Sequence, residues 1–159
     1  EESPWDTYRR TLKCNLAGEV FIAARRSYPF QVVAIREYTK GDVAKMQRLY
    51  DILDHDNVLT ARECFVNEGY MYALVNDLQL TLEQLVGCRS LYPTEAELAS
   101  IIWQILNGLC YLNETGLEHQ SLRCRNILLD LDGVIKIGEL MLLARSILVS
   151  ARMFYSYER

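Results

Sequence analysis

A long amphipathic helix is the feature that most constrains what this chain can fold into. Thr94 and Glu97 have the spacing of a capping box, in which two side chains satisfy backbone N–H groups at a helix N-terminus. Gly116 then supplies a C-terminal stop. Between these two signals, apolar residues recur at intervals of three and four: Leu98, Ile101, Ile102, Ile105, Leu106, Leu109 and Leu112. The pattern predicts a helix over residues 94–115.

A small hairpin is predicted directly after the helix, over residues 126–138. The apolar runs NILLD and VIKI flank LDG, and the Asp132–Gly133 pair tolerates the positive φ that a tight hairpin turn requires. The helix and the hairpin are separated by the stretch HQSLRCRN, residues 119–126.

The first half of the chain has the pattern of antiparallel strands with one helix. Runs rich in β-branched and aromatic residues predict strands at 19–24, 30–36, 60–66 and 70–75. Residues 41–53 carry an apolar stripe at helical spacing. The order of strands, one helix, a long helix and a final hairpin indicates the α+β class.

Composition excludes several functions. The net charge of -4 argues against nucleic acid or anionic lipid as partners, because both are bound mainly through excess Lys and Arg. The five cysteines form no C-x-x-C pair, and the two histidines lie far apart, so no zinc site is predicted. Reduced thiols favour the cytoplasm, with the nucleus as an alternative. No segment approaches the roughly 18 apolar residues of a membrane helix.

The order of these elements resembles a eukaryotic protein kinase domain. The stretch ELASIIWQILNGLCYLNETGLEHQSLRCRNILLDLDGVIKIGEL is similar to the middle of such a domain. Upstream, VVAIR at 32–36 resembles the Val-Ala-Ile-Lys strand, and LDHDNVL at 53–59 resembles the segment after the regulatory helix. The resemblance implies a protein kinase-like fold, with an antiparallel N-lobe sheet, one regulatory helix and the first helical part of the C-lobe.

The resemblance also divides the chain into three parts. Residues 1–80 are expected to form the N-lobe, and residues 81–140 part of the C-lobe. Residues 141–159 have a high apolar content that predicts a helical tail. Because these residues leave no room for the helices that dock peptide substrates in the family, we expect an incomplete C-lobe, truncated after the Asp-Phe-Gly position.

Three catalytic positions of the family carry different residues here. Ser121 stands where the aspartate accepts the proton of the substrate hydroxyl, and a neutral hydroxyl does not take that proton. Arg36 replaces the strand lysine, and Met46 falls where the helix glutamate pairs with it. The resemblance therefore implies a pseudokinase, a degenerate domain without phosphotransferase activity.

The nucleotide-binding positions are partly kept. The glycine-rich loop falls on Lys13, Asn15, Gly18 and Val20, so two of its three glycines are replaced. The positions that would contact a nucleotide are Gly18, Val20, Ala34, Arg36 and Leu128. We expect no cofactor, or weak binding of ATP.

Two positions that bind magnesium in the family keep suitable oxygen atoms. Asn126 is retained, and the Asp-Phe-Gly triplet reads Glu139, Leu140, Met141. Glu139 is one methylene longer than aspartate, which weakens magnesium binding without excluding it. The alternative to a pseudokinase is thus a weak ATP- and magnesium-binding kinase with residual serine/threonine phosphotransferase activity.

For four residues, a purely structural interpretation stands beside the functional one. His119 is expected to be a buried, hydrogen-bonded core histidine, and Lys136 an exposed strand residue. Arg36 is either a solvated or locally paired arginine or a phosphate contact. Cys124 has no neighbouring base in the sequence to activate it and is expected to be inert.

A protein interface is predicted on the long helix. If the chain lacks the segments that cover this helix in the family, its apolar stripe lies bare, which a soluble monomer does not tolerate. We therefore expect a protein partner or a homodimer. The interface residues predicted on the helix and the tail are Leu98, Ile101, Ile105, Leu109, Ile147 and Phe154.

Overall fold

The structure is a computed structural model that describes residues 3–75, 80–139 and 142–144. Residues 142–144 are described as backbone alone. They form strand β10 (Leu142–Ala144), so the predicted helix does not hold for this part of the tail. The predicted interface residues Ile147 and Phe154 lie outside the described residues, as do Leu140 and Met141 of the triplet that begins at Glu139.

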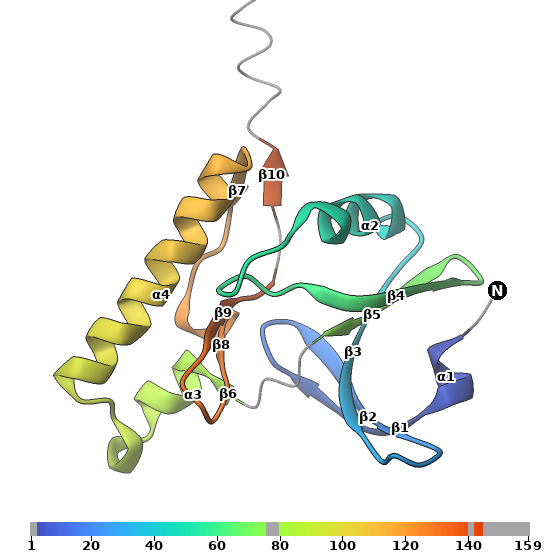
Figure 1. Cartoon of the computed structure of the whole chain (residues 1–159), viewed down its shortest axis with the longest axis horizontal. Coiled ribbons are helices and arrows are strands. Elements are labelled where there is room, and N and C mark those ends of the chain that lie inside the picture. The colour runs from blue at the N-terminus through green and yellow to red at the C-terminus, as the bar shows by residue number, and fades with distance from the viewer. Residues whose placement is uncertain (1–2, 76–79, 140–141, 145–159) are drawn as a thin grey trace, which may run out of the picture.

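A five-stranded antiparallel sheet forms the first half of the fold (Figure 1). Its strands lie in the order β1-β2-β3-β5-β4. Four of the five strands match predicted runs within about two residues, whereas β1 was not predicted. The strands are β1 (Tyr8–Asn15), β2 (Glu19–Arg25), β3 (Val32–Tyr38), β4 (Ala61–Asn67) and β5 (Tyr70–Val75), preceded by the short helix α1 (Pro4–Thr7).

One helix, α2 (Val43–Ile52), packs on this sheet where the sequence predicts a helix (Figure 1). It buries Met46, Leu49 and Tyr50, which recur at intervals of three and four. This spacing places the three side chains on one face of α2, toward the sheet.

The second half consists of one long helix and short strands. Helix α4 (Glu95–Glu114) lies along the side of the molecule away from the large sheet (Figure 1). Strands β6, β8 and β9 form a three-stranded sheet, and β10 pairs with β7. The remaining bounds are β6 (Leu80–Thr81), α3 (Leu82–Gly87), η1 (Arg89–Leu91), β7 (Leu117–His119), η2 (Cys124–Asn126), β8 (Ile127–Leu129) and β9 (Ile135–Ile137).

The predicted capping box and hairpin are confirmed. The Thr94 hydroxyl accepts the Glu97 N–H at 3.3 Å, and the Glu97 carboxylate accepts the Thr94 N–H at 2.8 Å. Strands β8 and β9 pair antiparallel, and Gly133 has a φ of 81° in the turn between them. This conformation is accessible to glycine without steric cost.

The two halves are joined at β9. Leu59 donates its N–H to the Ile137 carbonyl at 2.9 Å, and Ile137 donates to the Asn57 carbonyl at 2.9 Å. The side chain of Asn57 also donates to Gln104 on α4 and to the carbonyl of Ile135. One hydrophobic core therefore runs from the large sheet through β9 to α4.

The predicted bare stripe on α4 is wrong in part. Ile101 is 8% exposed, and Ile105 and Leu109 pack partly buried against the core. Leu98 is half-buried. This part of the stripe is covered because α4 packs on β9 and β7 of its own chain. Two other residues of the stripe, Ile102 and Leu106, are exposed, as is the neighbouring Trp103.

Lys136 is a second correction, because it was expected to be exposed. It is 8% exposed, and its ammonium donates to the Asp56 carbonyl at 2.7 Å. Burial lowers the pKa of Lys136, against the opposing influence of the Asp56 and Asp130 carboxylates. The aliphatic stem lies in the interior and the charged group is held by a backbone acceptor.

Candidate functional site

A hollow of about 310 Å³ lies where the β1–β2 loop, β3, α2 and the segment after β9 meet. It brings together four of the residues that the sequence singles out: Gly18, Arg36, Met46 and Glu139. The other lining residues are Ala17, Glu19, Glu37, Tyr38, Asp42 and Lys45. This is the candidate site, because it corresponds to the phosphate-binding region that the resemblance implies.

Arg36 is turned toward the β1–β2 loop. The residue is 6% exposed, and its Nη1 donates to the backbone carbonyl oxygen of Ala17 at 2.7 Å. Its Nη2 donates to the carbonyl oxygen of Leu16. The fork of the guanidinium is thus occupied by two adjacent carbonyls of the loop. Of the two interpretations of Arg36, the structure shows the locally paired arginine.

The polarity of the loop is the opposite of a phosphate-binding loop. Such loops present backbone N–H groups to the anion. Here the Gly18 N–H is taken by the Asn15 side chain at 3.2 Å, and the Leu16 N–H by the Gly18 carbonyl at 3.0 Å. The carbonyls of Leu16 and Ala17 face the site instead. Their partial negative charge repels a phosphate and attracts the guanidinium.

Ala17 closes the space beneath the loop. It is 1% exposed and has a φ of 53°, a left-handed conformation that is uncommon outside glycine. A Cβ placed on Gly138 would lie 2.8 Å from the Cβ of Ala17. The loop is therefore packed down onto the residue that precedes Glu139.

On the α2 side, the position of the family's ion pair carries the uncharged Met46, between the lining residues Asp42 and Lys45 and the core. Met46 is 6% exposed and lines the hollow beside Arg36. Next to it, the hydroxyls of Tyr38 and Tyr50 are hydrogen-bonded at 2.8 Å. Burial raises the pKa of both tyrosines, so both are neutral at physiological pH.

The stretch 119–126 is held by internal hydrogen bonds. The Nδ1 of His119 accepts the Ser121 N–H at 3.2 Å, and Nε2 lies 2.9 Å from the Gly138 carbonyl. Because a carbonyl only accepts, Nε2 carries the proton. Half-buried His119 therefore links the loop to the segment before Glu139, a structural role that agrees with its expected hydrogen bonding.

Asn126 also has a structural role in the stretch 119–126. It is 1% exposed, and its amide donates to the Ser121 carbonyl at 2.7 Å. Its backbone carbonyl accepts the Gly138 N–H at 2.8 Å. Asn126 thus fixes the loop around Ser121, while its side-chain oxygen is the atom that would contact a cation.

The metal-binding capacity of the described residues is small. No group of three His, Cys, Asp or Glu residues that could hold a metal ion occurs in the described part of the chain. Glu139 is half-buried with a φ of 47° and lines the hollow with Arg36. Asn126 and Glu139 would be the protein ligands of a magnesium ion that arrives with ATP, which is fewer oxygens than Mg²⁺ requires without phosphate and water.

The three apolar positions expected to contact a nucleotide are buried. Val20, Ala34 and Leu128 are at most 3% exposed and belong to one core cluster. An open adenine slot would leave its walls accessible to solvent. These three side chains therefore serve as core in this conformation.

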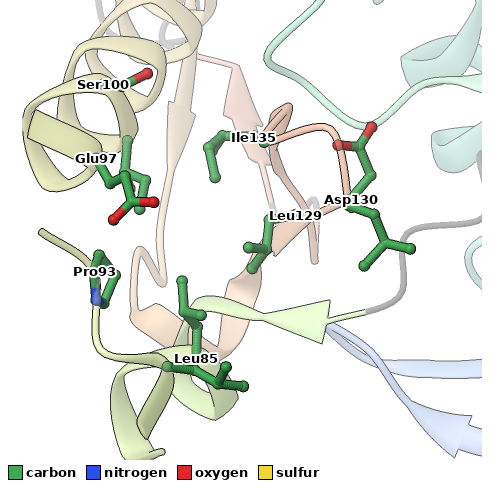
Figure 2. Close-up of a pocket in the computed structure, with 11 residues that line it drawn as sticks. Leu85, Pro93, Glu97, Ser100, Leu129, Asp130 and Ile135 are labelled. Carbon is green, nitrogen blue, oxygen red and sulfur yellow. The ribbon is translucent and has the colours of Figure 1, made fainter. Parts of the chain in front are cut away.

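A second hollow, of about 240 Å³, lies between α3, the start of α4 and the β8–β9 turn. Figure 2 shows Leu85, Leu129 and Ile135 around it, with Glu97 on the α4 side. Hydrogen bonds from Thr94 lower the pKa of Glu97, which is engaged in the capping box. The hollow is mainly apolar and contains no arrangement suited to catalysis among the described residues.

The residues that close the site were missed in the sequence. Leu16 and Ala17 contribute through backbone carbonyls, which no side-chain motif reveals. A weak signal exists in Asn15 and Gly18, because both residue types favour tight turns and their spacing fits one closed by the asparagine side chain.

Comparison with known proteins agrees with the fold and the position of the site. A family model described as the protein kinase domain matches residues 18–145, well over half of the chain. The chain therefore belongs to the protein kinase domain family. None of the helices in the described residues is long and apolar enough to cross a membrane.

The relatives include proteins named as serine/threonine-protein kinases and one named as a kinase adapter. A probable serine/threonine-protein kinase of Dictyostelium discoideum is 30% identical over 152 residues, 86% of this chain and 12% of the relative. The serine/threonine-protein kinase srb10 of Schizosaccharomyces pombe is 31% identical over 67% of this chain and 30% of its own length. The STE20-related kinase adapter protein strd-1 of Caenorhabditis elegans is 28% identical over 87% of this chain and 37% of its own. The chain thus spans well under half of each of these relatives.

Proposed function

We propose that this kinase-like chain is a pseudokinase module that transfers no phosphate and acts through contacts with other proteins. The observation that carries the proposal is the pair of hydrogen bonds from Arg36 to the carbonyls of Leu16 and Ala17. They hold the β1–β2 loop closed over the phosphate region.

The energetics favour the closed loop over phosphate binding. A bound triphosphate would have to displace Ala17 from its contact at Gly138 and turn two carbonyls away from Arg36. Hydrogen bonds to a charged donor contribute about 1.5–3 kcal/mol each, so this rearrangement costs much of the free energy that phosphate contacts would supply. Occupation of the site by its own loop therefore competes with ATP.

Two further positions support the absence of catalysis. Ser121 offers no carboxylate to accept a proton, and its backbone is used to hold the loop. Met46 leaves α2 without a partner for a phosphate-gripping cation. Losses in parts of one catalytic unit do not add, but each removes a separate requirement of phosphoryl transfer.

The alternative function is a weak kinase that binds ATP and magnesium. It is favoured by the retained oxygens of Asn126 and Glu139 and by relatives named serine/threonine kinases. It requires the loop to open and Arg36 to release its two carbonyls. The two functions therefore differ in whether Mg-ATP stabilises the folded chain.

The experiment measures the free energy of unfolding with and without Mg-ATP, together with transfer of radiolabelled phosphate to generic substrates. We expect millimolar Mg-ATP to add no more than about 0.4 kcal/mol, the value for a Kd near 1 mM. Incorporation of label should not exceed that of a heat-killed control. Time-dependent labelling would establish the weak kinase instead, and a clear stabilisation at a tenth of that concentration would show that the closed loop does not exclude ATP.

A matched variant tests whether Arg36 closes the site. Arg36→Lys keeps the charge but removes the planar fork that engages both carbonyls. We expect this variant to gain more stability from Mg-ATP than the parent chain does. Arg62→Lys, at an exposed position of β4, makes the same exchange away from the site and should behave as the parent.

Action through proteins is the second half of the proposal. The apolar face of α4 formed by Ile102, Trp103 and Leu106 is more than half exposed at each residue. Surfaces of this kind commonly mark contacts between proteins. A relative named as a kinase adapter is consistent with such a role. We propose a protein partner or a second copy of the chain, and no resident cofactor.

The compartment proposed is the cytoplasm, with the nucleus as the alternative. None of the five cysteines forms a disulfide bond within the described residues, which suits a reducing environment.

A further inference from the structure

A hollow of about 340 Å³ at the end of the β1–β2 hairpin farthest from the loop has an unusual composition. It is lined by Arg9, Ala24, Arg25, Arg26 and Phe30. The lining includes three arginines and no acidic residue, although the whole chain has a net charge of -4. Like charges gathered in one place repel one another, so this cluster needs a physical reason.

Among the residues that the structure describes, no ion pair neutralises these three cations. The ion pairs formed by described residues join Arg10 to Glu37 and Lys13 to Glu19, and neither involves the hollow. Arg26 uses its Nε to donate to the Trp5 carbonyl at 3.2 Å, which leaves its terminal nitrogens for other acceptors.

Arg25 has a side-chain donor that lacks a hydrogen-bond acceptor. Its Nε is buried and has no hydrogen-bond partner among the described residues. A buried donor without an acceptor costs about 1–3 kcal/mol, so the guanidinium of Arg25 is short of acceptors within the described residues. The donors that the hollow offers to a ligand are those of the exposed residues Arg9 and Arg26.

The walls of the hollow are set by the backbone. Arg26 donates its N–H to the Thr7 carbonyl at 2.9 Å, and Arg25 donates to the Gln31 carbonyl at 2.8 Å. Arg9 lies opposite Ala24 in the β1–β2 register, and the small side chain of Ala24 leaves room beside it. The cavity is therefore formed before a ligand arrives.

Two aromatic residues stand beside the arginines. Phe30 lines the hollow and is 81% exposed, and Tyr28 is 85% exposed. Their rings pack edge to face, with centroids 6.4 Å apart. Together they provide an apolar surface next to a cationic cavity.

We propose that this hollow binds a phosphate monoester carried on a side chain of a protein partner. Guanidinium groups match phosphate oxygens through paired hydrogen bonds, and the charge of a phosphate monoester suits a cluster of arginines. The volume lies at the lower end of the range for ligand pockets, about 300–1,000 Å³, which fits one phosphorylated side chain. Tyr28 and Phe30 then contact the neighbouring residues of the partner.

The phosphorylated side chain specifies the class of protein partner in the proposed function. The inference rests on the proposed function only because it takes the partner to be a protein. An anionic membrane is less favoured, because membrane attraction depends on a broad cationic field and this chain is acidic overall. A recessed cavity with three cations instead selects a compact anion.

The test uses fluorescence anisotropy with a labelled alanine-glycine peptide that carries one phosphotyrosine, its phosphoserine counterpart and its unphosphorylated form. We expect the phosphorylated peptides to bind and the unphosphorylated form to bind at least about tenfold more weakly. Arg9→Gln combined with Arg26→Gln should weaken binding by about 10- to 100-fold. Both residues are exposed, and circular dichroism checks that the double variant is folded.

Arg10→Gln is the matched control for the single substitution Arg9→Gln. Arg10 is the neighbour of Arg9 on β1, but its guanidinium lies 4.0 Å from the ring centroid of Trp5 and pairs with Glu37. Arg9→Gln and Arg10→Gln change the net charge equally. Arg10→Gln should therefore leave peptide binding within about twofold of the parent.

Three results would overturn the inference. The first is equal binding of phosphorylated and unphosphorylated peptides, and the second is equal weakening by Arg10→Gln and Arg9→Gln, which indicates non-specific charge attraction. The third is binding to phosphatidylserine vesicles that depends on Arg9 and Arg26 while the peptides do not bind. None of these results bears on nucleotide binding or phosphate transfer, so the pseudokinase proposal would stand or fall separately.

Discussion

The Nη1 of Arg36 donates a hydrogen bond to the backbone carbonyl of Ala17 over 2.7 Å, inside a region where Arg36 is 6% exposed. This contact joins β3 to the loop between β1 and β2. It substitutes a protein acceptor for the phosphate oxygens that a cation at this position binds in the family. Arg36 therefore ties the loop to β3 of its own chain.

The first prediction concerns the stability that this contact provides. Arg36→Met keeps most of the side-chain volume but removes both donors, so the Leu16 and Ala17 carbonyls lose their partners. We expect a loss of about 2 kcal/mol in the free energy of unfolding, measured by urea denaturation. Arg62→Met, at an exposed position, should change it by less than about 0.5 kcal/mol. An Arg36→Met chain as stable as the parent would show that the contact contributes nothing.

The second prediction concerns the close approach of α4 to the segment before β4. A Cβ on Gly108 would lie 2.7 Å from the Asn57 carbonyl oxygen and 2.9 Å from the Ile137 Cδ1. Gly108→Ala should therefore destabilise the chain by about 2 kcal/mol, because overpacking outweighs the helix propensity of alanine.

Gly87→Ala, at the end of α3, is the control for this effect. A Cβ there meets no atom within 4 Å. Thermal or urea denaturation should show Gly87→Ala to be as stable as the parent or more stable. Equal effects of the two substitutions would mean that α4 can shift away from Asn57 at little cost.

The family and most of the elements could be predicted from the sequence because they depend on local patterns. The Thr94–Glu97 capping box and the Asp132–Gly133 turn use side chains or conformations specific to those residues, and both occur as predicted. Strand β1 was missed because YRRTLKCN is mostly polar, with Tyr8 buried and most of the others exposed. Its position is fixed by pairing with β2 rather than by its own pattern.

The site could be located from the sequence but not described. The resemblance to the protein kinase motifs implied that Gly18, Arg36, Met46 and Glu139 share one site, and the hollow contains all four. The direction of the loop carbonyls and the burial of Lys136 depend on tertiary contacts that periodicity does not report. The covered face of α4 was assigned as bare for the same reason, since β7 and β9 come later in the chain.

The third prediction concerns the reactivity of two cysteines. A hydrogen bond with Ser90, 3.2 Å away, lowers the pKa of Cys88. Burial of the sulfur, together with the Asp51 and Glu63 carboxylates, raises the pKa of Cys64 from 9.0 to about 11. Because the thiolate is the reactive form, Cys88 should react first as the pH rises toward 8.

Iodoacetamide labelling followed by mass spectrometry measures both rates in one sample. We expect Cys88 to react about tenfold faster than Cys64, since the gain in thiolate is partly offset by lower nucleophilicity. Ser90→Ala should slow Cys88 and leave Cys64 unchanged. A faster reaction at Cys64 would contradict the pKa order.

The last prediction concerns self-association through α4. Ile102, Trp103 and Leu106 are 56%, 64% and 53% exposed and lie within one turn of the helix, so they form one apolar face. Burying side chains of this size is worth roughly 1.5–3 kcal/mol each, which favours a dimer at micromolar concentration. Light scattering should therefore report a mass above that of the single chain. Trp103→Glu should shift it toward the monomer, because a dimer would then bury an unpaired charge.

Leu12→Glu is the control for this prediction. Leu12 is 59% exposed on β1, so the change has the same character at a comparable exposure on another element. It should leave the measured mass unchanged. Two results would contradict self-association through α4: a parent chain that is monomeric at the same concentration, and a dimer that resists Trp103→Glu. In either case, the proposed partner of this face of α4 is a different protein.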